Sequence, residues 1–220
     1  MSLRVGLTGG LASGKTTVAE MFAARGAYLL YADKVGHELM EPGQPVYDEI
    51  IKHFGESIVN PGRSINRAKL AEVAFGAGRI EELNRIVHPA VRARLESWIE
   101  EMSEFDPHSV LIFEAALILE AGMGKHFDKL VVVSSRPQQK LERFAKRTVG
   151  AELAAESARA KALSEAERRI GAQLSDEEKM AAADYVIDNS GELSQTERQV
   201  AKVYKELQQL AAGKAIHSRI

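Results

Sequence analysis

A lysine and two threonines follow a glycine-rich bend near the start of the chain. Residues 9–16 read GGLASGKT and match the pattern GxxxxGK[ST], between an apolar run and a helical pattern. Glycines let backbone N–H groups turn toward phosphate oxygens, and the following helix adds the positive end of its dipole. Lys15 can then reach the β- and γ-phosphates, and the Thr16 hydroxyl can hold Mg²⁺. The loop predicts a nucleoside-triphosphate site. Its contact residues are Gly10, Leu11, Ala12, Ser13, Gly14, Lys15, Thr16 and Thr17.

Two acidic residues each follow an apolar run. Glu114 comes directly after Val110–Phe113, where a Walker-B-like acid is expected. Asp33 follows Ala27–Tyr31, so it stands at the carboxyl end of another predicted strand. A carboxylate there can accept the proton of an attacking hydroxyl. Asp is also a favoured helix N-cap, so both roles remain open for Asp33.

The rest of the chain narrows the class of phosphate-binding protein. No Asn-Lys-x-Asp motif for reading a guanine base follows a later strand, and the chain of 220 residues is short for a motor. These features favour a small-molecule phosphotransferase. Two alternatives stay open: a kinase for a nucleoside monophosphate or a sugar, and a non-catalytic domain that binds nucleotide and regulates a partner.

Short apolar runs alternate with longer helical patterns, which predicts an α/β fold with a mainly parallel sheet. The expected strands are Leu3–Thr8, Ala27–Tyr31, Ser109–Phe113, Lys129–Val133 and Tyr185–Ile187. The second and third lack polar alternation, which indicates strands buried on both faces. Long helical stretches follow the second and fourth strands. Because ligands bind at the carboxyl edge of such sheets, we expect two helical appendages there.

Composition excludes several kinds of site. The chain has no cysteine, so it holds no disulfide, thiolate metal site or cysteine nucleophile. A net charge of −2 gives no general attraction to nucleic acid or to membranes. No apolar run approaches the ~20 residues that span a bilayer, and no signal peptide is evident. We expect a cytoplasmic protein with small-molecule substrates, acting as a monomer or a weak homo-oligomer.

Many segments resemble one family of kinases. "GLTGGLASGKTTVA", "PGQPVYDEI", "INRAKLAEVAF", "LNRIVHPAVR", "LERFAKR", "RRIGAQLSDEEK" and "ADYVIDNSG" have the order and spacing of dephospho-coenzyme A kinase, over about residues 3–195. The resemblance implies ATP-dependent phosphorylation of the ribose 3′-hydroxyl of dephospho-CoA. It also implies a P-loop core with a five-stranded parallel sheet, a helical substrate domain and a helical lid. Applied to this chain, the core takes residues 1–34, 105–136 and 180–220, the substrate domain takes 35–104, and the lid takes 137–179.

The same resemblance assigns roles to residues outside the loop. Asp33 matches the family's general base, and Lys15 is expected to be catalytic as well. We expect Glu114 to contact the substrate and to hold Mg²⁺ through water. His88 and Arg92 match the substrate domain, and their spacing of four puts them on one helical face. Because His88 precedes a proline, we expect the helix to break there and to turn both side chains toward a pocket. A structural kink with a solvated arginine is the alternative.

Three cations share another predicted helical face. Lys140, Arg143 and Arg147 lie one turn apart in the predicted lid. Such a face suits closure over a triphosphate, with Arg143 as a catalytic charge and Arg147 on ATP. A merely solvated face is the alternative. Asn189 follows the last strand, where family members pass the adenine with backbone contacts.

The chain departs from the family pattern at several positions. Tyr31 and Glu114 stand where the family usually has Asp, and Ala12 stands where it has Gly. Ala116 replaces a proline, and Lys140 replaces a glutamine. The lid also carries extra residues around 150–162. None of these changes removes Lys15, Thr16 or Asp33.

Overall fold

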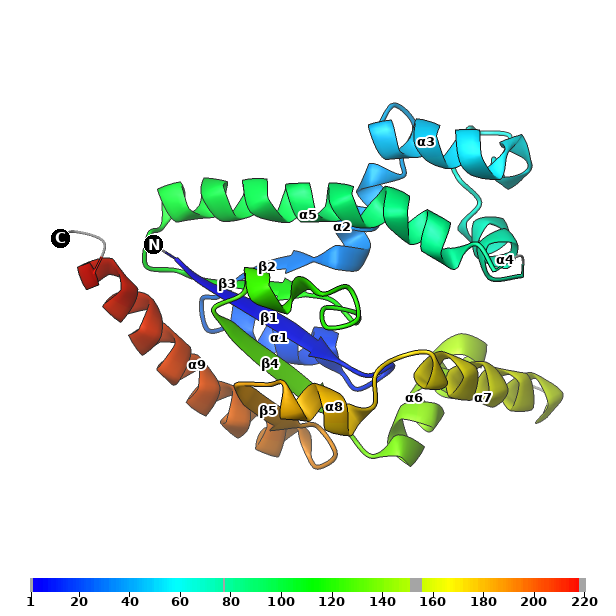
Figure 1. The fold of residues 1–220 in the computed structure, drawn as a ribbon. Coiled ribbons are helices and arrows are strands. Elements are labelled where there is room, and N and C mark those ends of the chain that lie inside the picture. Colours follow the sequence, from blue (N-terminus) through cyan, green and yellow to red (C-terminus); the bar gives the residue numbers. More distant parts are fainter. Residues whose placement is uncertain (1, 77, 151–155, 218–220) are drawn as a thin grey trace. The chain divides into compact units, whose positions relative to one another are not determined.

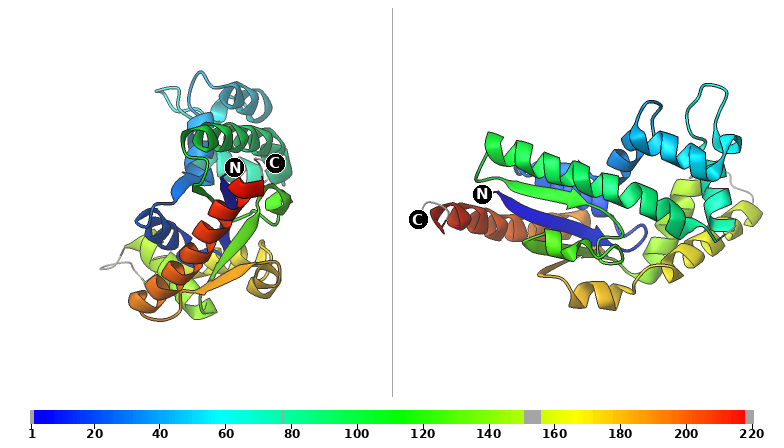
Figure 2. Two further views of the ribbon diagram at one scale, coloured as in Figure 1. Left: turned by 90° about the vertical axis from the view of Figure 1, so that its left-hand side faces the viewer. Right: turned by 45° about the horizontal axis from the view of Figure 1, so that its top comes forward.

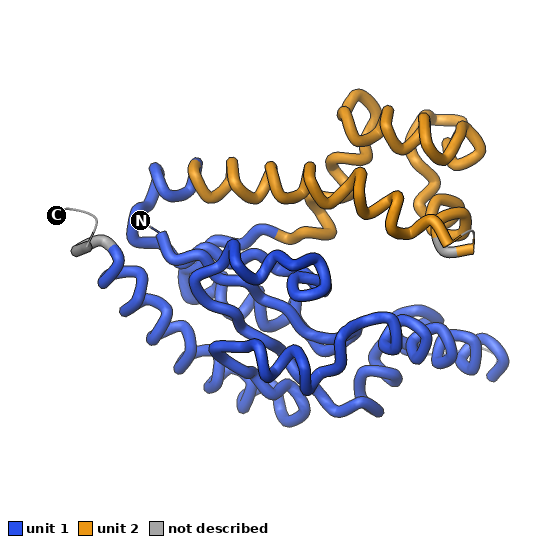
Figure 3. Tube along the Cα trace, in the orientation of Figure 1, with its two compact units in different colours: residues 1–30, 101–220 blue, residues 31–100 orange. Residues whose placement is uncertain are grey.

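The computed structural model describes residues 2–76, 78–150 and 156–217. Residues 151–155, inside the predicted lid and its extra stretch, lie outside the described residues. The chain divides into two compact units, one of residues 1–30 with 101–220 and one of residues 31–100 (Figure 3). The division of the first unit into core and lid stays a prediction.

A five-stranded sheet is the centre of the first unit (Figure 1). Its strands are β1 (Leu3–Gly9), β2 (Tyr28–Tyr31), β3 (Val110–Glu114), β4 (Lys129–Ser134) and β5 (Tyr185–Asp188). The order is β2-β3-β1-β4-β5, and β1 pairs in parallel with β3 and β4, as β4 does with β5. The predicted α/β fold and all five predicted strands are confirmed.

Burial along the strands follows their place in the sheet. β3 has four buried residues in a row before Glu114, as expected of a strand covered on both faces. β2 is different, because each of its four residues is only half-buried. The prediction that this strand is buried on both faces was wrong. The apolar run of β2 resembles that of β3. However, β2 lies at the edge of the sheet and has only one neighbouring strand in it.

Five helices of the first unit surround the sheet and extend from it. They are α1 (Lys15–Ala23), α6 (Pro137–Val149), α7 (Glu156–Gly171), α8 (Asp176–Ala181) and α9 (Leu193–His217), and a short 3₁₀ turn, η2, covers Met123–His126. α1 and α9 contact each other and both contact β1 and β3. α6 and α7 pack on each other, as the views of Figure 2 also show, and α8 packs on β4.

The second unit is helical and has its own apolar core. Its elements are α2 (Ala32–Leu39), α3 (Pro45–Phe54), the 3₁₀ turn η1 (Glu56–Ile58), α4 (Arg67–Gly76) and most of α5 (Ile80–Phe105). The core is formed by Val46, Tyr47, Ile50, Phe54, Ile58, Ile65, Leu70 and Ala74. Within the described residues of both units, no helix is long and apolar enough to pass through a membrane.

Helix α5 continues through Pro89, so the predicted break at His88 was wrong. A proline in a helix removes one N–H donor and disfavours helical backbone in the residue before it. The helix is nevertheless anchored beyond the proline, because Val91, Leu95 and Trp98 are buried along one stripe. Burial of that stripe outweighs the local cost, so packing rather than local preference sets the helix boundary.

Candidate active site

The predicted phosphate loop joins β1 to α1 in the first unit. Gly14, the N-cap of α1, has a φ of 93°, which favours glycine. A Cβ at this position would also collide with the side-chain amide of Asn189. No side chain caps the helix and no acidic residue stands in its first turn. The first backbone N–H groups of α1 therefore face no competing anion from their own helix.

The side chains of the loop are arranged around this helix end. Lys15 Nζ donates to the carbonyl oxygen of Gly10 at 3.1 Å, so the lysine folds back over the loop. Thr16 and Thr17 are exposed. Ala12 adopts a φ of 54°, a left-handed conformation that costs an alanine about 1–2 kcal/mol. The loop thus keeps the conformation that a glycine would favour at position 12.

Asn189 fastens the loop to the end of β5. Its Nδ2 donates to the carbonyl oxygen of Ser13 at 2.8 Å, and its Oδ1 accepts from Thr196 Oγ1 at 3.0 Å. The side chain is buried, with 7% of its surface exposed. One donor and one acceptor of its amide are therefore engaged within the protein.

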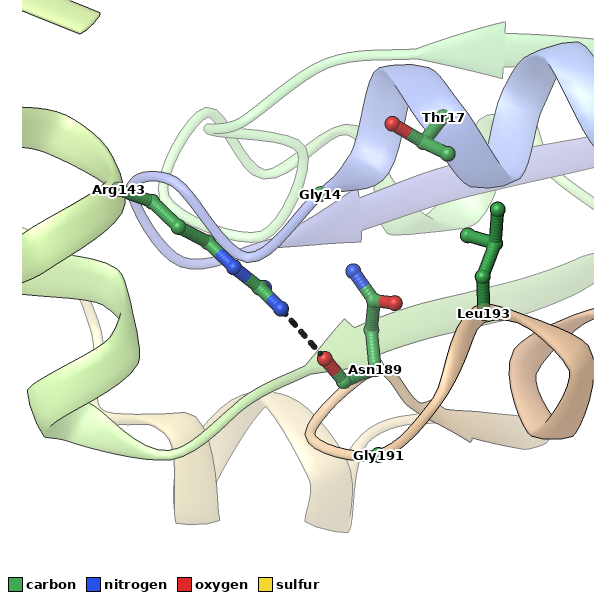
Figure 4. Close-up of a pocket in the computed structure, with 6 residues that line it drawn as sticks. All are labelled: Gly14, Thr17, Arg143, Asn189, Gly191 and Leu193. Atoms are coloured by element: carbon green, nitrogen blue, oxygen red, sulfur yellow. Dashed lines mark hydrogen bonds between the residues drawn. The ribbon is translucent and has the colours of Figure 1, made fainter. Parts of the chain in front are cut away.

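A cavity of about 300 Å³ lies beside this connection (Figure 4). Its lining residues are Gly14, Thr17, Arg143, Asn189, Gly191 and Leu193. Arg143 reaches in from α6, and its Nη2 donates to the carbonyl oxygen of Asn189 at 3.0 Å. Its Nη1 is buried and has no hydrogen-bond partner among the described residues. A buried guanidinium N–H without an acceptor is costly, so the site is suited to an anionic or carbonyl group.

Glu114 is the last residue of β3, and it lies at the carboxyl ends of the parallel strands, where the phosphate loop follows β1. It is half-buried, and its residue pairs with Leu7 of β1. The chain beyond it is fixed through Ala116, whose carbonyl oxygen accepts from Thr8 Oγ1 and from Lys179 Nζ, each at 3.1 Å. These two donors hold the segment around Ala116 in place.

The three cations of α6 have different environments. Lys140 is buried and forms an ion pair of 2.5 Å with Asp176. Arg143 lines the cavity, as described above. Arg147 is exposed, and its guanidinium lies 5.8 Å from the centre of the Phe144 ring, while that of Arg169 lies 5.6 Å from the same ring. A shared helical face therefore does not give these cations a shared role.

In the second unit, His88 and Arg92 lie on the same face of α5. Burial lowers the pKa of His88 below its usual 6.5, and the positive charge of Arg92 lowers it further. Arg92 Nε is buried and has no hydrogen-bond partner within the described part of the chain. The pair thus combines a neutral imidazole with a cation whose hydrogen-bonding capacity is not filled.

Asp33 stands in the first turn of α2 and is exposed. The N-cap of this helix is Tyr31, and it makes no side-chain cap. The alternative that Asp33 is the N-cap was therefore wrong. Its negative charge still interacts favourably with the positive end of the helix dipole, but the helix does not depend on Asp33 for a capping hydrogen bond.

The sequence reasoning missed several residues around the loop. Gly191 and Leu193 line the cavity, and Asp176 pairs with Lys140. The first two follow the last strand directly, so their place at the carboxyl edge of the sheet was a usable signal. Asp176 gave no such signal, because only the packing of α8 brings it to α6.

Comparisons with known proteins agree with this architecture. A family model described as dephospho-CoA kinase matches residues 3–195. A dephospho-CoA kinase of Aquifex aeolicus is 40% identical over 93% of this chain and 97% of its own length. One of Thermobifida fusca is 35% identical over 99% of this chain and 100% of its own.

Solved structures show the same fold. A crystal structure of a Thermus thermophilus protein superposes with a TM-score of 0.72 at 28% identity, covering 94% of this chain and 98% of that one. A dephospho-CoA kinase of Campylobacter jejuni gives a TM-score of 0.68 at 23% identity, covering 95% and 98%. The sequence matches extend over the loop, the second unit and the segment that carries Arg143 and Asn189. The chain belongs to the dephospho-CoA kinase family.

Proposed function

We propose that this protein transfers the γ-phosphoryl group of ATP to the ribose 3′-hydroxyl of dephospho-CoA and so completes coenzyme A. The observation that carries the proposal is the uncapped N-terminus of α1 beside the cavity into which Arg143 reaches. Backbone N–H groups, Lys15 and Arg143 together offer the donors that a polyphosphate needs. Membership of the family supplies the acceptor.

ATP binds along the loop and the cavity. Its phosphates accept from the backbone of residues 10–17 and from Lys15, which exchanges its bond to the Gly10 carbonyl for the β- and γ-phosphates. Its base occupies the part of the cavity at the turn of Asn189 and Gly191, and the part at Gly14 and Arg143 is left to the phosphates. Leu193, which is 54% exposed, offers an apolar surface there.

Magnesium fits the oxygen donors at this edge. Thr16 is exposed in the first turn of α1, and Glu114 ends a strand adjacent to β1. Among the described residues no group of three or more acidic or histidine side chains gathers to hold a metal, so phosphate oxygens and water complete the coordination. Thr16 would bind the ion directly and Glu114 through water. When bound, Mg²⁺ neutralises charge on the phosphates.

Arg143 and Arg147 stabilise the charge that develops on the transferring group. Arg143 is already fixed by its bond to the Asn189 carbonyl, and its second terminal nitrogen is buried without a partner among the described residues. Arg147 is exposed and adds its charge from the next turn of α6. Fixed donors of this kind are worth about 10²–10³ in rate each.

The acceptor is bound by the second unit. Asp33 accepts the proton of the 3′-hydroxyl, and His88 with Arg92 holds an anionic part of dephospho-CoA. The exposed carboxylate of Asp33 and the unpaired Nε of Arg92 support these roles.

The test is ADP formation from MgATP with dephospho-CoA, AMP, CMP, gluconate or no acceptor. We expect turnover with dephospho-CoA alone. Turnover with another acceptor would contradict the proposed acceptor but keep the nucleotide site. No turnover despite ATP binding would favour the non-catalytic regulator. The cytoplasmic location and the monomeric or weakly oligomeric state stay predictions from the sequence.

A further inference from the structure

A buried ion pair connects two helices beside the phosphate loop. Lys140 of α6 and Asp176 of α8 are 2.5 Å apart, and their side chains are 4% and 19% exposed. Such pairs are costly to bury, and removing one partner leaves an uncompensated charge. The pair therefore needs an explanation beyond the modest value of a surface ion pair.

The pair lies directly against Gly10. A Cβ at Gly10 would come within 2.8 Å of Asp176 Oδ1 and 3.1 Å of Lys140 Nζ. Gly10 is not among the described residues with positive φ, so its backbone does not require glycine. Glycine is needed at this position because a side chain would collide with the ion pair. The carbonyl oxygen of Gly10 also accepts a hydrogen bond from Lys15. The ion pair and the phosphate-binding lysine therefore contact the same residue of the loop.

Helix α8 is fixed on its other side as well. Lys179 is fully buried, pairs with Glu120 at 2.8 Å and donates to the Ala116 carbonyl. Glu120 also accepts from the backbone N–H of Leu174 at 3.1 Å. Through these contacts of Lys179, the segment that follows Glu114 fixes the helix that carries Asp176. One short helix connects α6, the phosphate loop and the acid-bearing strand end.

We infer that Lys140 protects the phosphate loop from the negative charge of Asp176. Lys140 cancels the charge of a carboxylate that packs against Gly10 and would otherwise repel the phosphates. The inference rests on the proposed nucleotide site and is independent of the acceptor.

Removing the positive charge of Lys140 and removing the negative charge of Asp176 should have different effects on nucleotide binding. Lys140→Gln leaves the Asp176 carboxylate uncompensated beside a polyanion, so ATP affinity falls. Asp176→Asn leaves an ammonium there, so ATP affinity rises or holds. One unpaired charge near such a site changes affinity by about tenfold at low ionic strength. A merely structural pair would lower affinity in both variants.

Calorimetry of MgATP binding to the full chain at low salt tests this asymmetry. We expect a roughly tenfold loss in Lys140→Gln, no loss in Asp176→Asn and near-parental affinity in the double variant. Lys129→Gln and Asp184→Asn are controls for the loss of one charge elsewhere, because this more exposed Lys–Asp pair of 2.7 Å joins the starts of β4 and β5. Neither control should change ATP affinity.

A second pair of variants tests the contact with Gly10. Gly10→Ala should weaken ATP binding about tenfold or more through the clash, and Asp176→Ala in the same chain should recover part of the loss. This cycle remains decisive if Lys140→Gln does not fold.

Losses in both charge variants, or no recovery in the Gly10→Ala cycle, would overturn this role of Lys140. Absence of ATP binding in the parent chain would instead overturn the proposed function together with this inference.

Discussion

The phosphate loop and the helical unit of residues 31–100 are built in different ways. The loop is held by contacts from several segments, since Asn189 fastens Ser13 and the Lys140–Asp176 pair abuts Gly10. In the helical unit, Asp33 is exposed and Arg92 Nε has no hydrogen-bond partner among the described residues. The backbone of the loop is held by contacts that exist before a ligand binds, although Ser13 Oγ and Arg143 Nη1 have no hydrogen-bond partner among the described residues. The helical unit presents side-chain groups that a ligand would engage.

This difference predicts that substitutions in the two regions will affect ATP affinity and turnover differently. Groups already fixed by the protein pay little further entropy when a phosphate arrives. Groups that are exposed or unfilled gain their partners only with the substrate. Changes in the loop should therefore act mainly on ATP binding. Changes at Asp33 and Arg92 should act on turnover and on the acceptor.

The largest effect is expected for Asp33→Asn. Loss of a general base lowers kcat by about 10²–10⁴, while the ATP dissociation constant stays within about twofold because the loop is intact. Steady-state kinetics and calorimetry on the same preparation check both numbers. Asp48→Asn, in the first turn of α3 of the same unit, is the control and should leave kcat unchanged. A kcat within a few-fold of the parent would refute the base assignment.

Arg143→Ala should have the next largest effect. It removes a donor to the transferring group and the bond to the Asn189 carbonyl, so kcat should fall about 10²–10³. Arg168→Ala, on an exposed position of α7, is the comparison and should lose little activity. Equal losses in both variants would mean that overall charge, not the fixed geometry of Arg143, matters.

Asn189→Ala should weaken ATP binding without a comparable loss in saturated turnover. It removes the bond to Ser13, worth about 1 kcal/mol, so affinity falls by roughly fivefold to tenfold. Thr196→Val removes only the second bond of the Asn189 side chain and should cost less. Calorimetry with MgATP ranks the two variants. The reverse ranking would show that Thr196, not the loop contact, fixes this turn.

Ala12→Gly should stabilise the fold slightly. Glycine relieves a left-handed alanine at about 1–2 kcal/mol but adds 0.4–1 kcal/mol of unfolded-state entropy, so the net gain is about 1 kcal/mol or less. Chemical denaturation measures it. A clear loss of stability would mean that the methyl group makes contacts that outweigh the strain.

His88 should show the smallest but most local effect. Its pKa lies below 6.5 because of burial and then because of Arg92, so Arg92→Gln should raise it part of the way back. Since the folded state disfavours the charged imidazole, stability should fall as pH drops below 6.5. NMR titration of the imidazole protons reports the pKa directly. An unchanged value in Arg92→Gln would leave burial as the sole cause.

The sequence was sufficient where one segment carries the signal. The five apolar runs became the five strands, and the GxxxxGK[ST] pattern became a loop between β1 and α1. It was insufficient where distant segments decide. The edge position of β2 leaves its apolar residues half-buried, and packing carries α5 through Pro89. Lys140 was expected to join Arg143 and Arg147 on a face that closes over a triphosphate, yet Asp176 on another helix buries it in an ion pair.

The central claim is transfer to the ribose 3′-hydroxyl of dephospho-CoA, and the direct test is the identity of the product. Dephospho-CoA and MgATP would be incubated with the protein, and the product analysed by mass spectrometry and ³¹P NMR. We predict one new phosphate, on the 3′ carbon of the ribose, in a product indistinguishable from coenzyme A. A phosphate at another position, or ADP formed while dephospho-CoA remains unchanged, would contradict the account.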